Sequence, residues 1–443
     1  MNKSLILGYG LALMMASVYV RAEEPTREAY SQPVSGLDAN AMNTFYRGRT
    51  EFLQSWAVPP EGGNVSGLGP LFNRLACASC HQKNGRGHSP DTADERMLSM
   101  LVRLSLPGKG PHGSPMPHPS YGTQLNEEGI PGVPGEGRAS IHWQESSVRL
   151  ADGTNLKLRK PKLEFVDLAY GPLDGALTSP RVGQPVYGLG LLEAVPVSTL
   201  QHIAALQKKH GVHGSFNRVW DVVRQQEAPG RFGWKANSPS LPQQMAEAFI
   251  GDMGVTTPLF PDVQCAPQEH ACRGAIPSKT QPELSGERLN DLDFFATHLA
   301  PPPRRNVDDP QVKRGERLFS TSGCAQCHTP QMKTADHPRY PVTLPAQVIA
   351  PYSDLLLHDM GAGLADGRPD FKASGSQWRT PPLWGIGLVP VVNGHSQYLH
   401  DGRARNLEEA VVWHGGEASR ARDRYTKLPV DQRKDLLAFL ESL

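Results

Sequence analysis

The sequence has almost no net charge, at +1, and beyond its first residues it lacks any long apolar run. Its 45 basic and 44 acidic residues balance, so no net field favours nucleic acid or an anionic membrane as a partner. After residue 22 no segment is apolar enough to cross a bilayer. Cysteine is also scarce: there are six, and four of them fall in two short motifs.

The first 22 residues are typical of a secretory signal. Lys3 gives a charged start, residues 5–20 are apolar, and Val20-Arg21-Ala22 offers small residues at the cleavage positions. The alternative is a retained membrane anchor, but the apolar run of about 16 residues is shorter than the roughly 20 that a span needs. We expect cleavage and a periplasmic mature protein without a membrane span.

Two copies of the pattern C-x-x-C-H stand at Cys77-Ala78-Ser79-Cys80-His81 and Cys324-Ala325-Gln326-Cys327-His328. The pattern is typical of c-type haem attachment, in which two thiols bind the haem vinyl groups and the histidine is the proximal iron ligand. A zinc site needs four ligands and usually two such pairs close together. A redox dithiol needs no histidine at this place. The sequence therefore predicts two covalently bound haem c groups, with His81 and His328 on the irons.

The two remaining cysteines, Cys265 and Cys272, are predicted to form a structural disulfide, because an oxidising compartment favours the pairing of leftover cysteines. A catalytic dithiol is the alternative, although the spacing differs from C-x-x-C.

Glycine and proline are abundant, at 44 and 40 residues, which predicts a loop-rich fold wrapped around cofactors. Residues 139–168 alternate around Asp152-Gly153 and predict a β-hairpin. We expect a mainly α fold with two cytochrome c-like haem domains in tandem, at 23–300 and 309–443, joined by a Pro-rich linker at 301–308. The hairpin would be a small insertion in the first domain, covering the first haem edge. Helical patterns lie at 42–56, 197–209, 214–226, 241–250, 284–299, 312–319, 406–415 and 429–443.

An internal repeat relates the segments that follow the two motifs. A gapless alignment of Leu241 with Leu407 pairs Trp234 with His400, Gln244 with Ala410 and Ala248 with His414. His414 can be a sixth ligand of the second iron, whereas Ala248 cannot serve the first. The repeat thus predicts one saturated haem for electron transfer and one open haem for chemistry.

Several alternatives stay open. In one alternative, His414 is a surface histidine and binds no iron. In another, His88, His112, His118 or His142 is the sixth ligand of the first iron. In a third, Met253 or Met360 supplies a sulfur ligand.

With these residues in hand, the chain resembles the bacterial dihaem cytochrome c peroxidases and the dihaem enzyme that matures methylamine dehydrogenase. The matching segment is Tyr398-Leu399-His400-Asp401-Gly402-Arg403 followed by Leu407-Glu408-Glu409-Ala410-Val411. The resemblance implies that Trp234 lies between the haems, that Gln244 is distal at the peroxide-binding haem, and that His414 stands for the distal Met or Tyr. Residues 69–87, 187–196, 230–254 and 358–361 more closely resemble the dihaem oxidoreductases labelled as peroxidases or thiol oxidoreductases.

The chain departs from the peroxidases at the acid–base residue. They place a glutamate ten residues after the distal glutamine, where this chain has Gly254. Asp252 and Glu247 are the nearby carboxylates, and either is a candidate for moving the proton. Lys235 and Asn237 stand where that family has Asp and Arg.

Three further residues have predicted roles. Arg379 and Arg403 are expected to bind haem propionates, because a guanidinium meets a carboxylate with two hydrogen bonds. His358 either contacts a propionate, lines the region between the haems, or is a buried histidine with satisfied hydrogen bonds. A packed core tryptophan is the alternative for Trp234.

These features predict a periplasmic, peroxidase-like dihaem oxidoreductase. Electrons would enter at the C-terminal haem from a small redox protein, a cytochrome or cupredoxin, and hydrogen peroxide or a similar oxidant would react at the N-terminal haem. One alternative is a non-enzymatic dihaem electron-transfer protein linked to periplasmic metal handling. The other is a thiol oxidoreductase acting through Cys265 and Cys272. A calcium ion between the domains is a further expectation, and no nucleic-acid partner is expected.

Overall fold

The computed structural model describes residues 26–58, 66–275 and 282–443, so the predicted signal segment lies outside the described residues. About 32% of the described chain is helical and 20% is in strands or bridges, distributed over many small sheets. The expectation of a mainly α fold is therefore wrong. No helix in the described ranges is both long and apolar enough to span a bilayer.

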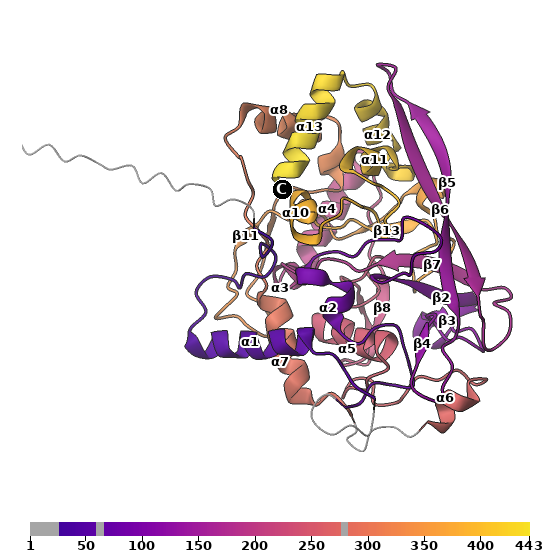
Figure 1. The fold of residues 1–443 in the computed structure, drawn as a ribbon. Coiled ribbons are helices and arrows are strands. Elements are labelled where there is room, and N and C mark those ends of the chain that lie inside the picture. Colours follow the sequence, from indigo (N-terminus) through magenta and orange to yellow (C-terminus); the bar gives the residue numbers. More distant parts are fainter. Residues whose placement is uncertain (1–25, 59–65, 276–281) are drawn as a thin grey trace, which may run out of the picture.

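Two helix pairs frame the molecule (Figure 1). Helix α1 (Ala39–Leu53) packs on α7 (Gly286–His298), and α8 (Pro310–Thr321) packs on α13 (Val430–Ser442). Each crossing is made at a glycine. A Cβ at Gly48 would lie 2.0 Å from the Asp291 carbonyl oxygen, and one at Gly315 would lie 1.9 Å from that of Asp435. The two backbones touch at these points, which a larger residue would prevent.

An aromatic side chain from each helix pair packs against the histidine of the nearby C-x-x-C-H motif. Phe52 lies 6.3 Å from His81 between ring centres, and Phe319 lies 6.3 Å from His328. A second phenylalanine backs the first in each case, with Phe295 and Phe439 at 5.5 and 5.1 Å. The internal repeat seen in the sequence is thus also a repeat of packing.

The remaining helices are short. They are α2 (Cys77–Cys80), α3 (Leu189–Glu193), α4 (Val197–Lys208), α5 (Leu241–Asp252), α6 (His270–Gly274), α9 (Gly361–Leu364), α10 (Val389–Asn393), α11 (Leu407–Val412) and α12 (Ser419–Thr426). The second motif forms a 3₁₀ turn, Cys324–Gln326. Both motifs therefore present their thiols from a single tight turn.

The strands pair over long and short distances along the chain. Strand β2 (Met100–Lys109) lies between β3 (Pro115–Met116) and β7 (Leu177–Val182). The other antiparallel pairs are β1 (Leu71–Phe72) with β4 (Glu128–Gly129), β5 (Arg138–Arg149) with β6 (Asn155–Val166), β8 (Arg218–Asp221) with β9 (Gln226–Pro229), β10 (Met332–Lys333) with β11 (Val348–Ile349), and β12 (Leu357–Asp359) with β13 (Gln377–Arg379).

The helix predicted at 214–226 is a hairpin, formed by β8 and β9. Val219 is buried and its neighbour Arg218 is exposed, which is the alternation of a strand. The Asp221 carboxylate accepts hydrogen bonds from the backbone N–H groups of Val223 and Arg224 and so fixes a turn. Gln225, with φ 52°, completes the reversal.

The predicted hairpin at 139–168 is confirmed as β5–β6, but it packs elsewhere than expected. None of its residues lines the cavity beside the first C-x-x-C-H motif, which is described below. Its outer end lies instead against the C-terminal helices (Figure 1), where Leu150 and Leu158 join their apolar core. The Ala151 N–H donates to the Thr426 carbonyl at 3.1 Å. A segment of the N-terminal half is thus bound to the C-terminal half.

The largest apolar core likewise combines residues from both sides of the predicted linker. Phe45, Phe249 and Phe295 share it with Leu355 and Trp384. The boundary at 301–308 stays a prediction, but the two halves are packed together as one body of side chains.

Candidate functional site

The first C-x-x-C-H motif borders a cavity whose other wall includes helix α5. Cys77, Cys80 and His81 line it, and α5 contributes Gln244 and Ala248 among other residues. Both cysteines are free thiols. The short distance between the motif and α5 follows from backbone hydrogen bonds, because the N–H of Asn73 donates to the Asp252 carbonyl at 2.7 Å.

The second motif borders a second cavity of similar construction. Cys324, Cys327 and His328 line it, together with Ala410 on α11 and His414 two residues beyond the end of that helix. These two cysteines are also free thiols. The repeat places α11 where α5 stands in the first cavity, so His414 occupies the position of Ala248.

The histidines of both cavities are held in one tautomer. The Nδ1 atoms of His81, His328 and His414 lie 2.6, 2.9 and 2.7 Å from the carbonyl oxygens of Gln184, Tyr352 and Ala410. A carbonyl only accepts, so each Nδ1 carries the hydrogen. Burial lowers the pKa of all three rings, that of His328 to about 4, so they are neutral. Each Nε2 therefore offers a lone pair, as metal-binding histidines do.

The spacing of His328 and His414 fits two ligands on one iron. Their ring centres are 6.4 Å apart. A ligating imidazole nitrogen lies about 2 Å from a metal, and its ring centre about 1.2 Å further, so two axial rings stand about 6.4 Å apart. The residues present thus fit a metal held between them, as the sequence predicts for the second haem.

The first cavity has no matching pair. Among the described residues that line it, His81 is the one histidine, and His88, His112, His118 and His142 lie elsewhere. Met253 lines this cavity and Met360 lines the second, so both remain within reach as sulfur ligands. The second cavity therefore has two facing histidines, His328 and His414, whereas His81 faces no second histidine among the described residues that line the first. The asymmetric haem pair stays a prediction.

Trp234 lines both cavities. It is buried, and its indole N–H donates to the Val182 carbonyl at 2.8 Å. Its ring meets His400 edge-on with centres 6.4 Å apart, and His400 stacks on Trp378 at 3.6 Å. Three rings thus adjoin one another at the wall between the cavities.

Two arginines, Arg86 and Arg379, also line both cavities. Burial lowers the pKa of each to about 10. Their hydrogen bonds go to backbone carbonyls, from Arg86 to Leu399 at 2.6 Å and from Arg379 to Gly233 at 2.9 Å, and the Arg86 Nε has no partner. A buried guanidinium without a carboxylate fits an anionic group bound in the cavity.

Arg403 lies differently from the sequence-based expectation. It lines neither cavity, and its guanidinium is paired with Asp401 at 2.6 Å. The carboxylate that Arg403 binds is therefore that of Asp401, two residues earlier in the chain, and not a haem propionate. Arg86, which was not assigned to a propionate, lines both cavities instead, and the signal for it was its place just after the first motif, between Gly85 and Gly87.

The two candidate carboxylates on α5 differ in their surroundings. Burial raises the pKa of Glu247 to about 7, and Gln243 donates to its carboxylate at 2.9 Å. Asp252 lines the cavity near the thiols and accepts from Gln124 at 2.9 Å. Gln244 faces the same cavity with its Oε1 unpartnered. Glu247 is the one with a pKa suited to exchanging a proton near neutrality, whereas Asp252 is the one of the two that lines the cavity.

His358 is a buried histidine bound by two carboxylates beside the second motif. Its Nε2 lies 2.8 Å from Asp354, and its Nδ1 lies 3.0 Å from Glu417. Burial alone would lower its pKa, but the hydrogen bonds to Asp354, Cys327 and Glu417 raise the pKa to about 12. The imidazole is therefore charged, and the expectation of a satisfied buried histidine describes it well, although it also lines the second cavity.

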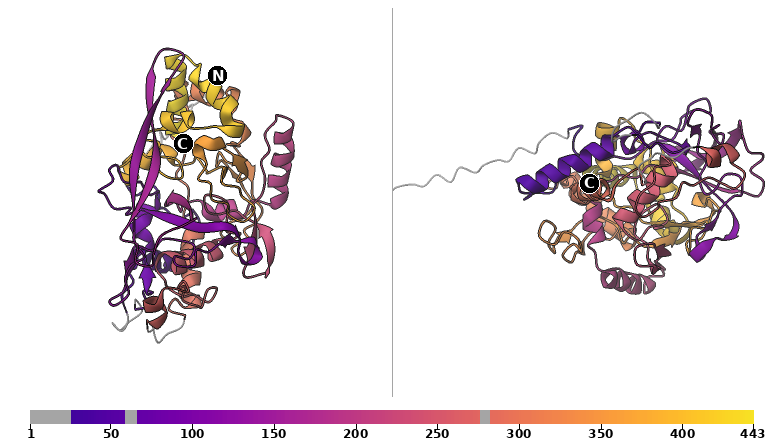
Figure 2. Two further views of the ribbon diagram at one scale, coloured as in Figure 1. Left: turned by 90° about the vertical axis from the view of Figure 1, so that its right-hand side faces the viewer. Right: turned by 90° about the horizontal axis from the view of Figure 1, so that it is seen from below.

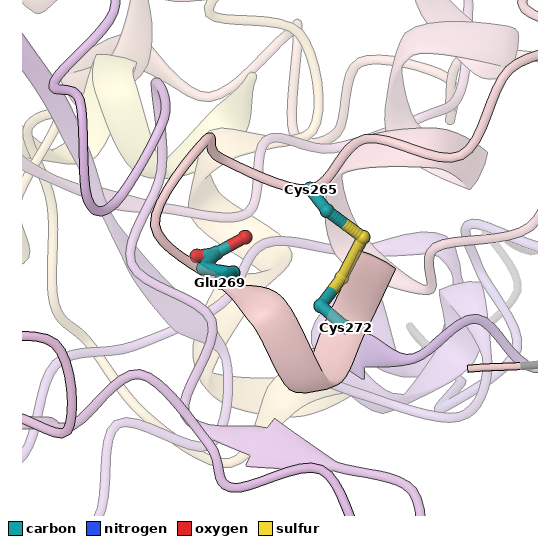
Figure 3. A group of neighbouring side chains, drawn as sticks. All are labelled: Cys265, Glu269 and Cys272. Atoms are coloured by element: carbon teal, nitrogen blue, oxygen red, sulfur yellow. A yellow bond between two sulfur atoms is a disulfide. The ribbon is translucent and has the colours of Figure 1, made fainter. Parts of the chain in front are cut away.

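Cys265 and Cys272 form the expected disulfide, with Glu269 beside it (Figure 3). Because its two sulfurs are bonded to each other, this group has no thiolate to offer a metal ion. In the described residues, Cys327, Asp354 and His358 also lie close enough together to hold a metal ion, but the group contains sulfur, whereas calcium takes oxygen ligands. The calcium ion between the domains stays a prediction.

Comparisons with known proteins place the chain. No curated protein matches it. A solved structure of hydrazine synthase from Kuenenia stuttgartiensis, pressurized with 20 bar xenon, is similar over 100% of both chains at 14% identity with a TM-score of 0.34. The family described as "Di-haem oxidoreductase, putative peroxidase" matches residues 17–443. The chain belongs to the di-haem oxidoreductase family.

Proposed function

We propose that the protein is a periplasmic, peroxidase-like oxidoreductase with two covalently attached haem c groups. Electrons would enter at the C-terminal site, where Cys324, Cys327, His328 and His414 would hold one haem, and a peroxide would be reduced at the N-terminal site, where Cys77, Cys80 and His81 would hold the other. The observation that carries the proposal is the asymmetry of the cavities, because His328 faces His414 whereas His81 shares its cavity with Ala248.

The attachment residues are Cys77 and Cys80 for one haem and Cys324 and Cys327 for the other. Their thiols are free and line the cavities, which supports a thioether bond to each. Arg86 and Arg379 would neutralise propionates. When bound, the haem iron supplies the redox chemistry that cleavage of a peroxide bond requires.

Reduction of hydrogen peroxide consumes two electrons and two protons and yields two water molecules. Glu247 is the group that holds a proton, since its pKa of about 7 leaves it partly protonated at neutral pH. Its side chain does not itself line the first cavity, and it stands on α5 between the lining residues Gln244 and Ala248. Gln244 orients the peroxide, because its unpartnered Oε1 accepts a hydrogen bond from an O–H in the cavity. Trp234, which borders both cavities, is the route for electrons from the second site.

A second candidate function is electron transfer without catalysis. Met253 lines the first cavity, and a sulfur ligand there would close the first iron and leave both haems saturated.

Low-temperature electron paramagnetic resonance of the oxidised protein, with and without hydrogen peroxide, separates the two. The proposal predicts one high-spin signal that peroxide alters and one low-spin signal. In His414→Ala the low-spin signal should become high-spin, whereas His142→Ala, on the exposed hairpin, should change neither. Two low-spin signals that peroxide leaves untouched, in both the oxidised and half-reduced states, would establish an electron carrier instead.

A further inference from the structure

The mouth of the second cavity is formed by the end of helix α4 and by helix α12. Lys209, His210 and Gly211 line it from one side, and Arg420, Arg422 and Arg424 line it from the other. The two sides touch, since the His213 N–H donates to Glu417 at 2.8 Å and Arg420 lies next to Gly211. Helix α4 projects from the body of the molecule, at the right of the left view in Figure 2. We call residues 208–213 and 416–427 the basic rim.

The basic rim concentrates positive charge on a chain whose net charge is +1. Its acidic residues are Glu417 and Asp423, and both are engaged, by His358 at 3.0 Å and by Arg422 at 2.8 Å. Against these stand six basic residues: Lys208, Lys209, Arg420, Arg422, Arg424 and Lys427. All but Arg422 are exposed, and within the described chain those five form no ion pair.

Both sides of the rim are also attached to the second C-x-x-C-H motif. Arg424 donates to the Ser322 carbonyl at 3.4 Å, two residues before Cys324. From α4, Gln207 donates to the carbonyl of Gln326 at 2.7 Å, between the two cysteines of the motif. A protein seated on the rim would therefore lie against the edge of the cavity where the thiols stand.

We propose that the basic rim docks the acidic face of a small electron-carrier protein. One electron passes from the reduced carrier to the second haem, so that the carrier is oxidised and the ferric iron becomes ferrous. The proposal rests on the proposed function, which makes the second haem the entry point. Attraction between opposite charges raises association rates about 10- to 1,000-fold at low ionic strength, and salt screens it.

The test uses the full-length holoprotein in a stopped-flow experiment. The variant Lys208→Glu/Lys427→Glu reverses two exposed charges of the rim that do not line the second cavity. Lys160→Glu/Lys162→Glu makes the same change on exposed lysines of β6. Reduced protein is mixed with oxidised plastocyanin, an acidic one-electron carrier, or with oxidised mitochondrial cytochrome c, a basic one. The assay follows electron transfer from the protein to the carrier, which is the reverse of the proposed direction, but the two proteins dock through the same surfaces in both directions.

At low ionic strength, the rim variant should react with plastocyanin about tenfold more slowly than the unaltered protein, and the difference should vanish near 0.5 M salt. With cytochrome c the rim variant should be faster. The β6 variant should match the unaltered protein with both. Equal rates for all three proteins would overturn the proposal. Salt-sensitive binding to anionic lipid vesicles, lost in the rim variant while the plastocyanin rate is unchanged, would overturn it in favour of a membrane surface.

Peroxide turnover with tetramethylhydroquinone, an uncharged donor that needs no docking, separates this proposal from the proposed function. The rim variant should retain that turnover in full. If the unaltered protein reduces no peroxide with any donor, the proposed function fails, whereas the charge dependence of the stopped-flow rates still decides the docking surface.

Discussion

Replacing Glu247 by Gln tests the acid–base assignment through stability as well as activity. Burial raises the pKa of Glu247 to about 7 from its ordinary value of 4.5. Between pH 4.5 and 7 the folded protein keeps a proton that the unfolded chain has lost, so the free energy of unfolding falls as the pH rises through this window. The total loss is about 3 kcal/mol, and above pH 7 it is constant. Because glutamine cannot ionise, a Glu247→Gln variant does not lose this free energy as the pH rises.

The expected result is therefore a pH-dependent difference. Measured by urea unfolding of the oxidised holoprotein, Glu247→Gln should gain about 3 kcal/mol relative to the unaltered protein between pH 4.5 and pH 8. The rate constant for reaction with hydrogen peroxide should fall about 10²- to 10⁴-fold and lose its change near pH 7. Glu227→Gln, at an exposed position on β9, is the matched control and should keep both the rate and the pH dependence.

Two outcomes would refute this reasoning. A stability difference that does not change with pH would mean that the Glu247 carboxyl is not held protonated by burial. A variant that reacts with peroxide as fast as the unaltered protein, with the same pH dependence, would remove Glu247 from the chemistry. Asp252 would then be the next candidate.

Other predictions concern the framework. Gly315→Ala should lower the free energy of unfolding by about 2 kcal/mol or more, because its Cβ would lie 1.9 Å from the Asp435 carbonyl, whereas Gly274→Ala, with nothing within 4 Å, should be nearly neutral in urea unfolding. His358 keeps its charge to a pKa of about 12, so it should make stability fall by about 1.4 kcal/mol per pH unit above 6.5, and His358→Gln should flatten that slope in unfolding curves at pH 7 to 9. Arg433→Gln removes the ion pair between Arg433 and Asp152 at the tip of the β5–β6 hairpin, so trypsin should cleave the tip several-fold faster. Unchanged cleavage would show that this ion pair does not hold the tip in place.

The sequence was informative where chemistry is local. Two five-residue motifs located both cavities, and a gapless repeat placed His414 opposite His328. The β5–β6 hairpin could be predicted because its turn, Asp152-Gly153, lies between its own strands. In each case the signal is contained in neighbouring residues or in a direct comparison of two segments.

The failures involve partners that are far away in the chain. Strand β2 pairs with β7 through contacts such as Met100 with Val182, which no local periodicity reveals, and the estimate of a mainly α fold missed such pairs. Arg403 was assigned to a propionate because the sequence did not show that Asp401 would claim its guanidinium. Arg86 was not predicted as a lining residue, since burial decides that role.

The attachment of the β5–β6 hairpin to the C-terminal helices bears on the order in which the chain is made. The Arg433 guanidinium meets Asp152 at 2.9 Å across 281 residues of sequence. During synthesis the hairpin emerges long before its docking site exists, with Leu150 and Leu158 lacking the apolar neighbours that later cover them. Closing so long a loop is slow, so complete burial of this ribbon must be among the last events of folding. A C-terminal fragment beginning at residue 309 would leave the complementary surface bare and would be prone to self-association.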